Sequence, residues 1–136
     1  MTGPATEELL EAARAAQTNA HAPYSHFSVG AAVRTSTGHI FSGSNVENVS
    51  FPEGICAEAS AIGAMVTAGE RTIVEVLTIA DGAEVTTCCG GCRQRLAEFA
   101  APETPVHAAG PDGIRRSFTL GELLPAAFGP EHLPPP

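Results

Sequence analysis

The chain has 136 residues, with 7 basic and 15 acidic side chains, so its formal net charge is −8 when the histidines are neutral. Hydrophobic residues make up 43% and charged residues 16%, which is typical of a folded globule and fits a single domain over residues 1–136. The acidic balance argues against binding of a nucleic-acid polymer, which needs clustered basic residues, but not against a small nucleic-acid-derived substrate.

Membrane and export segments are not expected. Residues 1–8 lack the basic region and the long apolar run of a secretory signal. No apolar stretch approaches the roughly 18 residues of a membrane helix. We therefore expect a cytoplasmic protein without a membrane partner.

Hydrophobic periodicity predicts a helix followed by a hairpin in the first part of the chain. Apolar residues recur at helical spacing over residues 6–20. Alternating apolar residues predict strands over 27–35 and 39–43, joined by a short turn. The polar segment 44–55 is predicted to be an irregular loop, the kind of segment in which functional groups often lie.

Helices and strands alternate in the rest of the chain. The predicted elements are a helix over 56–68, a strand over 73–80, a helix over 90–99, and strands over 104–109 and 114–118. Thr119 and Glu122 fit a capping box that starts a short helix, and residues 129–136 form a proline-rich tail. This order predicts an α/β fold with a mixed, roughly five-stranded sheet and helices on both faces.

Three of the four cysteines fit a metal site. Cys89 and Cys92 form a C-x-x-C motif, which alone fits a redox dithiol, half of a structural zinc site or chance. Cys56 adds a third thiol, and three protein ligands leave the fourth position of a catalytic zinc site open for water. Cys88 is a poor fourth ligand because it adjoins Cys89. Both cysteine groups lie at predicted helix N-termini, which favour thiolates.

Glu58 follows Cys56 by two residues. Beside a zinc-bound water, a carboxylate can shuttle a proton, so Glu58 is the candidate acid–base group. The alternative is an acidic residue of the first helical turn, which the helix dipole favours.

Several motifs in one order resemble the small zinc-dependent cytidine deaminases. They are APYSHFSVG at 22–30, SGSNVEN at 42–48, CAE at 56–58, CGGCRQ at 89–94, ELLP at 122–125 and FGP at 128–130. The resemblance covers nearly the whole chain. It implies a three-layer α/β/α cytidine-deaminase-like sandwich and the hydrolytic deamination of cytidine and 2′-deoxycytidine in pyrimidine salvage.

The same resemblance implies one Zn²⁺ per chain, bound by Cys56, Cys89 and Cys92. It further implies that zinc-bound hydroxide attacks C4 of the cytosine ring and that ammonia leaves. Glu58 takes the proton from the zinc-bound water and delivers it to N3 and the leaving amine.

Substrate contacts are also implied by the resemblance. Asn45 and Glu47 hold the ribose hydroxyl, and Phe27 flanks the base. The Ala57 backbone bonds the pyrimidine edge, and the Thr87 carbonyl accepts the substrate amine. Outside this context, Phe27 is expected in the core and Asn45 in a turn.

Phe128 is implied to reach the site of a neighbouring subunit. The working unit is then a homotetramer with active sites shared between subunits. From sequence alone, an aromatic residue in a tail indicates nothing specific.

Three positions depart from the family pattern. Ala59 stands where related enzymes have an arginine that hydrogen-bonds the zinc thiolates, and Arg93 is a candidate to replace it. Cys88 replaces a proline, which is expected to loosen the backbone and add a competing thiol, and Ser44 replaces a cysteine. These departures leave two alternatives to cytidine deamination: action on a modified cytosine nucleoside such as blasticidin S, or a weakly active, zinc-stabilised relative.

Overall fold

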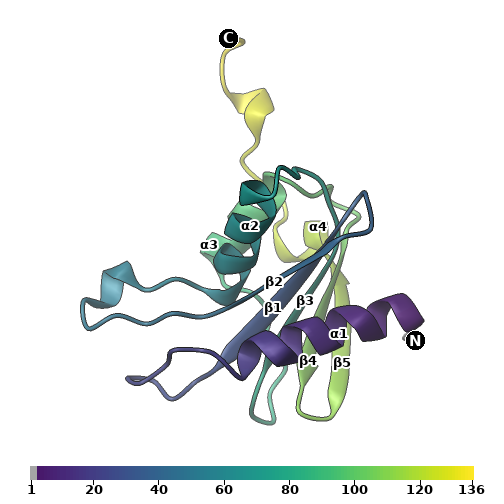
Figure 1. The fold of residues 1–136 in the computed structure, drawn as a ribbon. Helices are drawn as coiled ribbons and strands as arrows, with labels where there is room; N and C mark the ends of the chain where they lie inside the picture. Colours follow the sequence, from purple (N-terminus) through teal and green to yellow (C-terminus); the bar gives the residue numbers. More distant parts are fainter. Residues whose placement is uncertain (1–2) are drawn as a thin grey trace.

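The computed structural model describes residues 3–136 and contains one five-stranded sheet in the order β2-β1-β3-β4-β5 (Figure 1). The strands are β1 (Val29–Thr35), β2 (Ile40–Ser44), β3 (Ile73–Ala80), β4 (Pro105–Gly110) and β5 (Gly113–Thr119). The helices are α1 (Pro4–Gln17), α2 (Ala57–Thr67), α3 (Gly90–Ala97) and α4 (Leu120–Leu123), with single 3₁₀ turns at Phe51–Glu53 and Pro130–His132.

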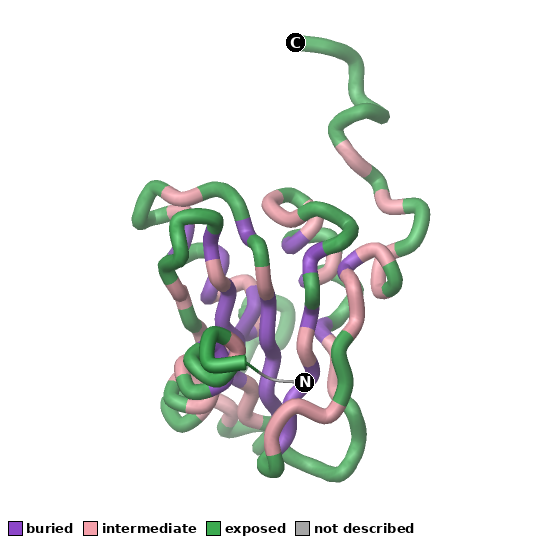
Figure 2. The backbone as a smooth tube through the Cα atoms, turned by 90° about the vertical axis from the view of Figure 1, so that its right-hand side faces the viewer, coloured by how far each residue is buried: buried purple, intermediate pink, exposed green. Residues whose placement is uncertain are grey.

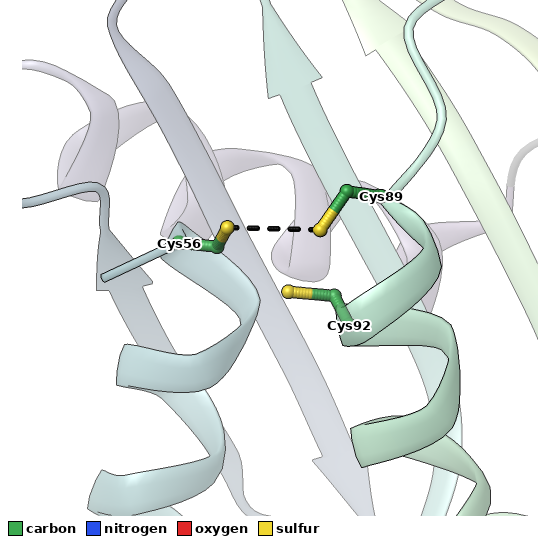
Figure 3. A group of neighbouring side chains, drawn as sticks. All are labelled: Cys56, Cys89 and Cys92. Carbon is green, nitrogen blue, oxygen red and sulfur yellow. Dashed lines mark hydrogen bonds between the residues drawn. The ribbon is translucent and has the colours of Figure 1, made fainter. Parts of the chain in front are cut away.

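The sheet is mixed, as predicted. β1 pairs antiparallel with β2 and β3, and β5 pairs antiparallel with β4. β3 and β4 are parallel, and this pair requires a crossover, which includes α3. The crossover places the start of α3 at the same end of the sheet as the start of α2, and these two helix starts carry the cysteines (Figure 3).

Helices cover both faces of the sheet, which gives the predicted three layers. On one face, Leu9 and Ala13 of α1 pack with Ala32 and Leu77. Successive strand residues point to opposite faces, so the neighbours Val33 and Val76 belong to the other layer, with α2 and α3. Figure 2 shows the buried backbone concentrated along the strands between these layers.

Two glycines allow the helices to approach the sheet closely. A Cβ at Gly43 of β2 would lie 2.5 Å from the Ala61 nitrogen of α2. A Cβ at Gly30 of β1 would lie 2.0 Å from the Ala13 carbonyl oxygen of α1. No side chain fits at either distance, so Gly43 sets how near α2, and with it Cys56, lies to the sheet.

Every predicted helix and strand is present, with ends that differ by three residues at most. The first helix stops at Gln17 because the next residues tighten into i→i−3 turns, with Asn19 N–H donating to Ala16. β1 begins at Val29 because the Phe27 carbonyl bonds to the Asn45 side chain. The capping box between Thr119 and Glu122 is confirmed.

The chain beyond α4 leaves the body of the molecule and ends far from the sheet (Figure 1). Phe128 lies in this segment and is 59% exposed. None of the helices within residues 3–136 is long and apolar enough to cross a bilayer.

Candidate metal centre and active site

Two helix starts bring the three predicted ligand cysteines together. Cys56 is the N-cap residue of α2, Cys89 is the N-cap residue of α3, and Cys92 lies in the first turn of α3. Their sulfur atoms all lie within 4.8 Å of one another. Figure 3 shows the three side chains pointing toward a common centre between the two helices.

The sulfur geometry fits zinc. The Cys56 and Cys89 sulfurs are 3.7 Å apart. Tetrahedral zinc with Zn–S bonds of ~2.3 Å requires sulfurs separated by about 3.8 Å. The chemistry of the donors agrees as well, because three thiolates form a common ligand type for zinc. Cys56, Cys89 and Cys92 therefore fit a single zinc ion with one position left for another ligand.

The environment of the thiols opposes their joint ionisation without a cation. Burial raises the pKa of Cys56 and Cys92, and the neighbouring thiols and Glu58 act in the same direction overall. For Cys89, burial is outweighed by hydrogen bonds from the Cys92 backbone and from the Cys56 and Cys92 thiols, and its pKa is lowered. Metal binding to this cluster would therefore release protons.

Glu58 lies beside this cluster, in the first turn of α2. Its side chain is nearly inaccessible, with 4% of the residue exposed. The hydroxyl of Thr78, on the central strand β3, donates to Glu58 Oε2 at 3.1 Å. This bond fixes one carboxylate oxygen and leaves Oε1 for other partners. Thr78 is a site residue that the sequence analysis missed, although a threonine in the most apolar strand was a detectable clue.

A cavity of about 300 Å³ joins most of the predicted site residues. Among its lining residues are the predicted Phe27, Asn45, Cys56, Ala57, Glu58, Thr87 and Cys89. Val29, Thr78 and Thr86 complete the lining and were not predicted. The volume lies at the lower end of the range for small-molecule sites. The cavity is thus suited to a ligand of a few rings at most, with Glu58 in its wall.

Asn45 holds the loop that carries Phe27. Its Oδ1 accepts from the Val29 backbone N–H at 2.9 Å. Its Nδ2 donates to the Phe27 carbonyl at 2.9 Å. An amide has two donors and two acceptor lone pairs, so one of each remains available. The side chain both shapes the cavity wall and retains hydrogen-bonding capacity toward a ligand.

Glu47 does not line the same cavity; it lines a second one with Tyr24 and Ser25. Its carboxylate accepts from the backbone N–H groups of Tyr24 at 3.0 Å and of Ser25 at 3.1 Å, and from the Ser25 hydroxyl. The hydrogen bonds with Ser25 come first in lowering its pKa, and that with Tyr24 adds to them. These bonds hold a tight turn in which His26 has a φ of 59°, a left-handed conformation uncommon outside glycine.

Phe128 is not brought to the cavity of its own chain. It stacks on His132, with ring centroids 5.2 Å apart, and its carbonyl accepts from the Gln94 side chain at 2.9 Å. In the single chain, Phe128 therefore lies outside the lining of the cavity that contains Glu58.

The two arginines of α3, Arg93 and Arg95, contact different groups. Arg93, the candidate replacement for the missing arginine, contacts none of the ligand sulfurs; it donates to the carbonyls of Cys88 and Leu123 at 2.8 Å and to Thr87 Oγ1 at 2.7 Å. Arg95 instead reaches the sulfur of Cys92, at 3.8 Å from Nη1. Sequence analysis overlooked Arg95.

Cys88 points into the core and leaves the metal cluster to the other three cysteines. It is 2% exposed and packs with the residues between α2, α3 and the sheet. Burial raises the pKa of this thiol to about 11. Arg93 holds the Cys88 carbonyl, so the backbone expected to be loosened has a specific restraint.

The family profile and the curated relatives that this chain matches are cytidine or deoxycytidylate deaminases. The profile of the cytidine and deoxycytidylate deaminase zinc-binding region matches residues 4–108. A curated cytidine deaminase of Halalkalibacterium halodurans is 36% identical over 92% of this chain and 95% of its own length. A probable cytidine deaminase of Dictyostelium discoideum is 40% identical over 93% of this chain and 86% of its own.

Solved structures give the same result. The crystal structure of a cytidine deaminase from Burkholderia pseudomallei superposes with a TM-score of 0.86 at 38% identity, covering 94% of this chain and all of that one (100%). The Mycobacterium tuberculosis cytidine deaminase superposes with a TM-score of 0.77 at 36% identity, covering 90% of this chain and 96% of that one.

Proposed function

Because the chain belongs to the cytidine and deoxycytidylate deaminase family, we propose that it hydrolyses cytidine and 2′-deoxycytidine to uridine and 2′-deoxyuridine, with release of ammonia. The observation that carries this proposal is the meeting of three ligand thiols and the Glu58 carboxylate at one small cavity. Thiol ligands, an acid–base group and a cavity that admits a small molecule are the components that a metal-assisted hydrolysis needs.

Cys56, Cys89 and Cys92 would hold the zinc ion. In a site with three protein ligands, zinc lowers the pKa of water toward about 7 and makes it a nucleophile at neutral pH. The N-cap positions of Cys56 and Cys89 support this assignment, because the partial positive charge of a helix start favours thiolates.

Glu58 moves the protons in the proposed reaction. It takes one proton from the attacking water and delivers it to ring N3. It then takes the second proton from the hydroxyl now on C4 and delivers it to the amino group, so that C4=O forms and the C4–N bond breaks as ammonia leaves. Its place in the cavity wall and the hydrogen bond from Thr78 support this role, because a proton carrier must be held within reach of both donor and acceptor.

Phe27, Ala57 and Thr87 are proposed to hold the base. Phe27 is 42% exposed and lines the cavity, so its ring is available to flank a pyrimidine. The backbone of Ala57 and the carbonyl of Thr87 are polar groups of the same wall, suited to the pyrimidine edge and to the amino group. Arg93 binds the Thr87 hydroxyl and the next carbonyl, which supports a fixed position for this loop.

Asn45 and Glu47 are proposed to hold the ribose hydroxyl. Asn45 lines the cavity and keeps one donor and one acceptor free. Glu47 has about four lone-pair sites, and Tyr24 and Ser25 occupy three of them. Its contribution to the ribose is therefore a single acceptor, whereas its main visible contacts are with the turn before Phe27.

One assay tests the activity. Zinc-loaded protein is incubated with cytidine, 2′-deoxycytidine, cytosine and blasticidin S, and loss of the cytosine chromophore is followed together with ammonia release. We expect turnover of the two nucleosides and almost none in Glu58→Gln, because an amide cannot carry the proton. Turnover of blasticidin S alone would replace the proposal with the modified-nucleoside alternative. Turnover of none, with zinc bound, would indicate the weakly active relative.

We also propose a homotetramer in which Phe128 enters a neighbouring site. Its exposure, the departure of its segment from the body, and the exposed Val49 (77%) and Phe51 (75%) support surfaces made for another subunit. Glu58→Gln and Phe128→Ala proteins, each of low activity, should regain activity when mixed and reassembled, because some sites then combine an intact Glu58 with an intact Phe128. No regain in tetramers shown to be mixed would contradict sharing.

The proposed cellular location is the cytoplasm. Three thiols must remain reduced to bind zinc, and reducing compartments keep them so. The four cysteines are all free in the structure, in agreement with that requirement.

A further inference from the structure

A guanidinium group contacts the metal cluster from α3. Arg95 Nη1 lies 3.8 Å from Cys92 Sγ, within hydrogen-bonding distance for sulfur. The seven basic residues of the chain are all arginines. Within residues 3–136, Arg95 is the one among them with a hydrogen bond to a ligand sulfur.

The helix geometry explains why Arg95 reaches this place. It follows Cys92 by three residues, so both lie on the same face of α3. Long side chains of a helix lean toward its N-terminus, which directs the guanidinium back over the first turn. A Cβ at Gly91 would lie 3.2 Å from Arg95 Nη1, so the absence of a side chain at Gly91 leaves room for the guanidinium.

The charge of the cluster gives this contact its importance. Zinc with three thiolates has a formal charge of −1, and the nearly buried Glu58 adds another negative charge. The starts of α2 and α3 offset part of this, with about half a positive charge each. Arg95 supplies a full positive charge at one of the thiolates.

In the part of the chain that the structure describes, no other arginine side chain hydrogen-bonds a ligand sulfur. Arg93, the nearest alternative along α3, uses its three guanidinium nitrogens on Cys88, Leu123 and Thr87. Position 59, the third residue after Cys56, has the same spacing to its cysteine as Arg95 has to Cys92, but it holds an alanine. The two positions differ in their helices, because Cys56 is the N-cap residue of α2 and Cys92 lies in the first turn of α3, but of the two only position 95 has a basic side chain.

We propose that Arg95 is a positioning residue of the metal centre, which neutralises and orients the Cys92 thiolate and thereby retains zinc. The inference rests on the proposed zinc function and concerns the retention of the ion, which can be measured without substrate.

The test compares zinc affinity across variants by competition with a chromophoric chelator. Arg95→Met should weaken zinc binding about 10- to 100-fold, the usual range for loss of a group that supports a ligand. Arg95→Lys, which keeps the charge, should retain part of the affinity. Arg14→Met is the matched control, because Arg14 lies on α1 across the sheet, where it pairs with Glu11 at 3.8 Å, and its loss changes the net charge equally.

A rescue distinguishes a charge at the thiolates from a merely structural role. Adding Ala59→Arg to Arg95→Met places a guanidinium three residues after Cys56 and should recover most of the affinity. In the cobalt-substituted proteins, the sulfur-to-cobalt absorption should shift in Arg95→Met and return in the double variant. Circular dichroism monitors folding, and Arg95→Gln provides a second neutral variant for the same comparison.

Two results would overturn the inference in different ways. Zinc affinity in folded Arg95→Met and Arg95→Gln equal to that of Arg14→Met would overturn the role of Arg95 alone. Failure of the unaltered protein to bind zinc would overturn the proposed function as well.

Discussion

Removing the hydroxyl of Thr78 tests how Glu58 is held. Thr78→Val keeps the shape of a side chain that is 2% exposed but leaves Glu58 Oε2, in a residue 4% exposed, without its 3.1 Å hydrogen bond. A hydrogen bond to a charged group contributes about 1.5–3 kcal/mol. Because about 1.4 kcal/mol corresponds to tenfold, the whole effect is about 10- to 150-fold in an equilibrium constant.

We expect this loss to affect both folding and catalysis. The free energy of unfolding should fall by about 1–3 kcal/mol, because a buried carboxylate oxygen loses its partner. The kcat should fall about tenfold, because the proton carrier loses its fixed orientation. Denaturant titration of the zinc-loaded protein measures the first quantity, and steady-state loss of the cytosine chromophore measures the second.

Thr78→Ser is the matched variant, because it keeps the hydroxyl and loses only a methyl group. Its kcat should stay near that of the unaltered protein even if its stability falls. Equal kcat values for the valine and serine variants would refute the orienting role of the hydroxyl.

Three further predictions concern packing, pH and metal. Gly43→Ala should destabilise the fold by about 1–3 kcal/mol in denaturant titrations, because its Cβ would clash with α2 at 2.5 Å, whereas Gly63→Ala, with nothing within 4 Å, should stabilise it by about 0.5–1 kcal/mol. Hydrogen bonds from Thr35, Thr37 and His39 hold the pKa of Glu70 at about 2, against 4.5 ordinarily. Its stabilising effect should therefore be present above pH 4.5 and be lost as the pH falls from 4.5 through 2, and titrations of Glu70→Gln should lack this component. Zinc at 100 times its dissociation constant should raise the free energy of unfolding by about 2.7 kcal/mol over the chelator-treated protein, and equal stability of the two forms would contradict the metal site.

The order of elements could be predicted from sequence because it depends on local patterns. The apolar run 73–80 became β3 with the same ends, and the capping box at Thr119 started α4 as expected. Element ends were less accurate where side chains compete for backbone groups. Asn45 takes the Phe27 carbonyl, which shortens the first strand, and no periodicity contains that information.

The candidate ligand cysteines were also predictable, because helix starts and the C-x-x-C spacing are local features of the sequence. The groups that support them were not. Thr78 and Glu58 are 20 residues apart, and their contact depends on how α2 packs on the sheet. Arg93 and Arg95 stand two positions apart on α3 and therefore face different neighbours; Arg95, three residues after Cys92, reaches its sulfur, whereas the partners of Arg93 include the distant Leu123 carbonyl.

The Asn45–Glu47 pair shows why binding and architecture are inseparable in this site. Both side chains are proposed to contact the ribose, yet their visible hydrogen bonds hold the chain around Phe27, on both sides of the strained His26. A substitution at Asn45 therefore removes a sugar contact and at the same time releases the aromatic wall of the cavity. The resulting loss of activity measures both effects together, so a change of sugar preference must be judged from the ratio of cytidine to 2′-deoxycytidine turnover, in which the shared effect on Phe27 cancels.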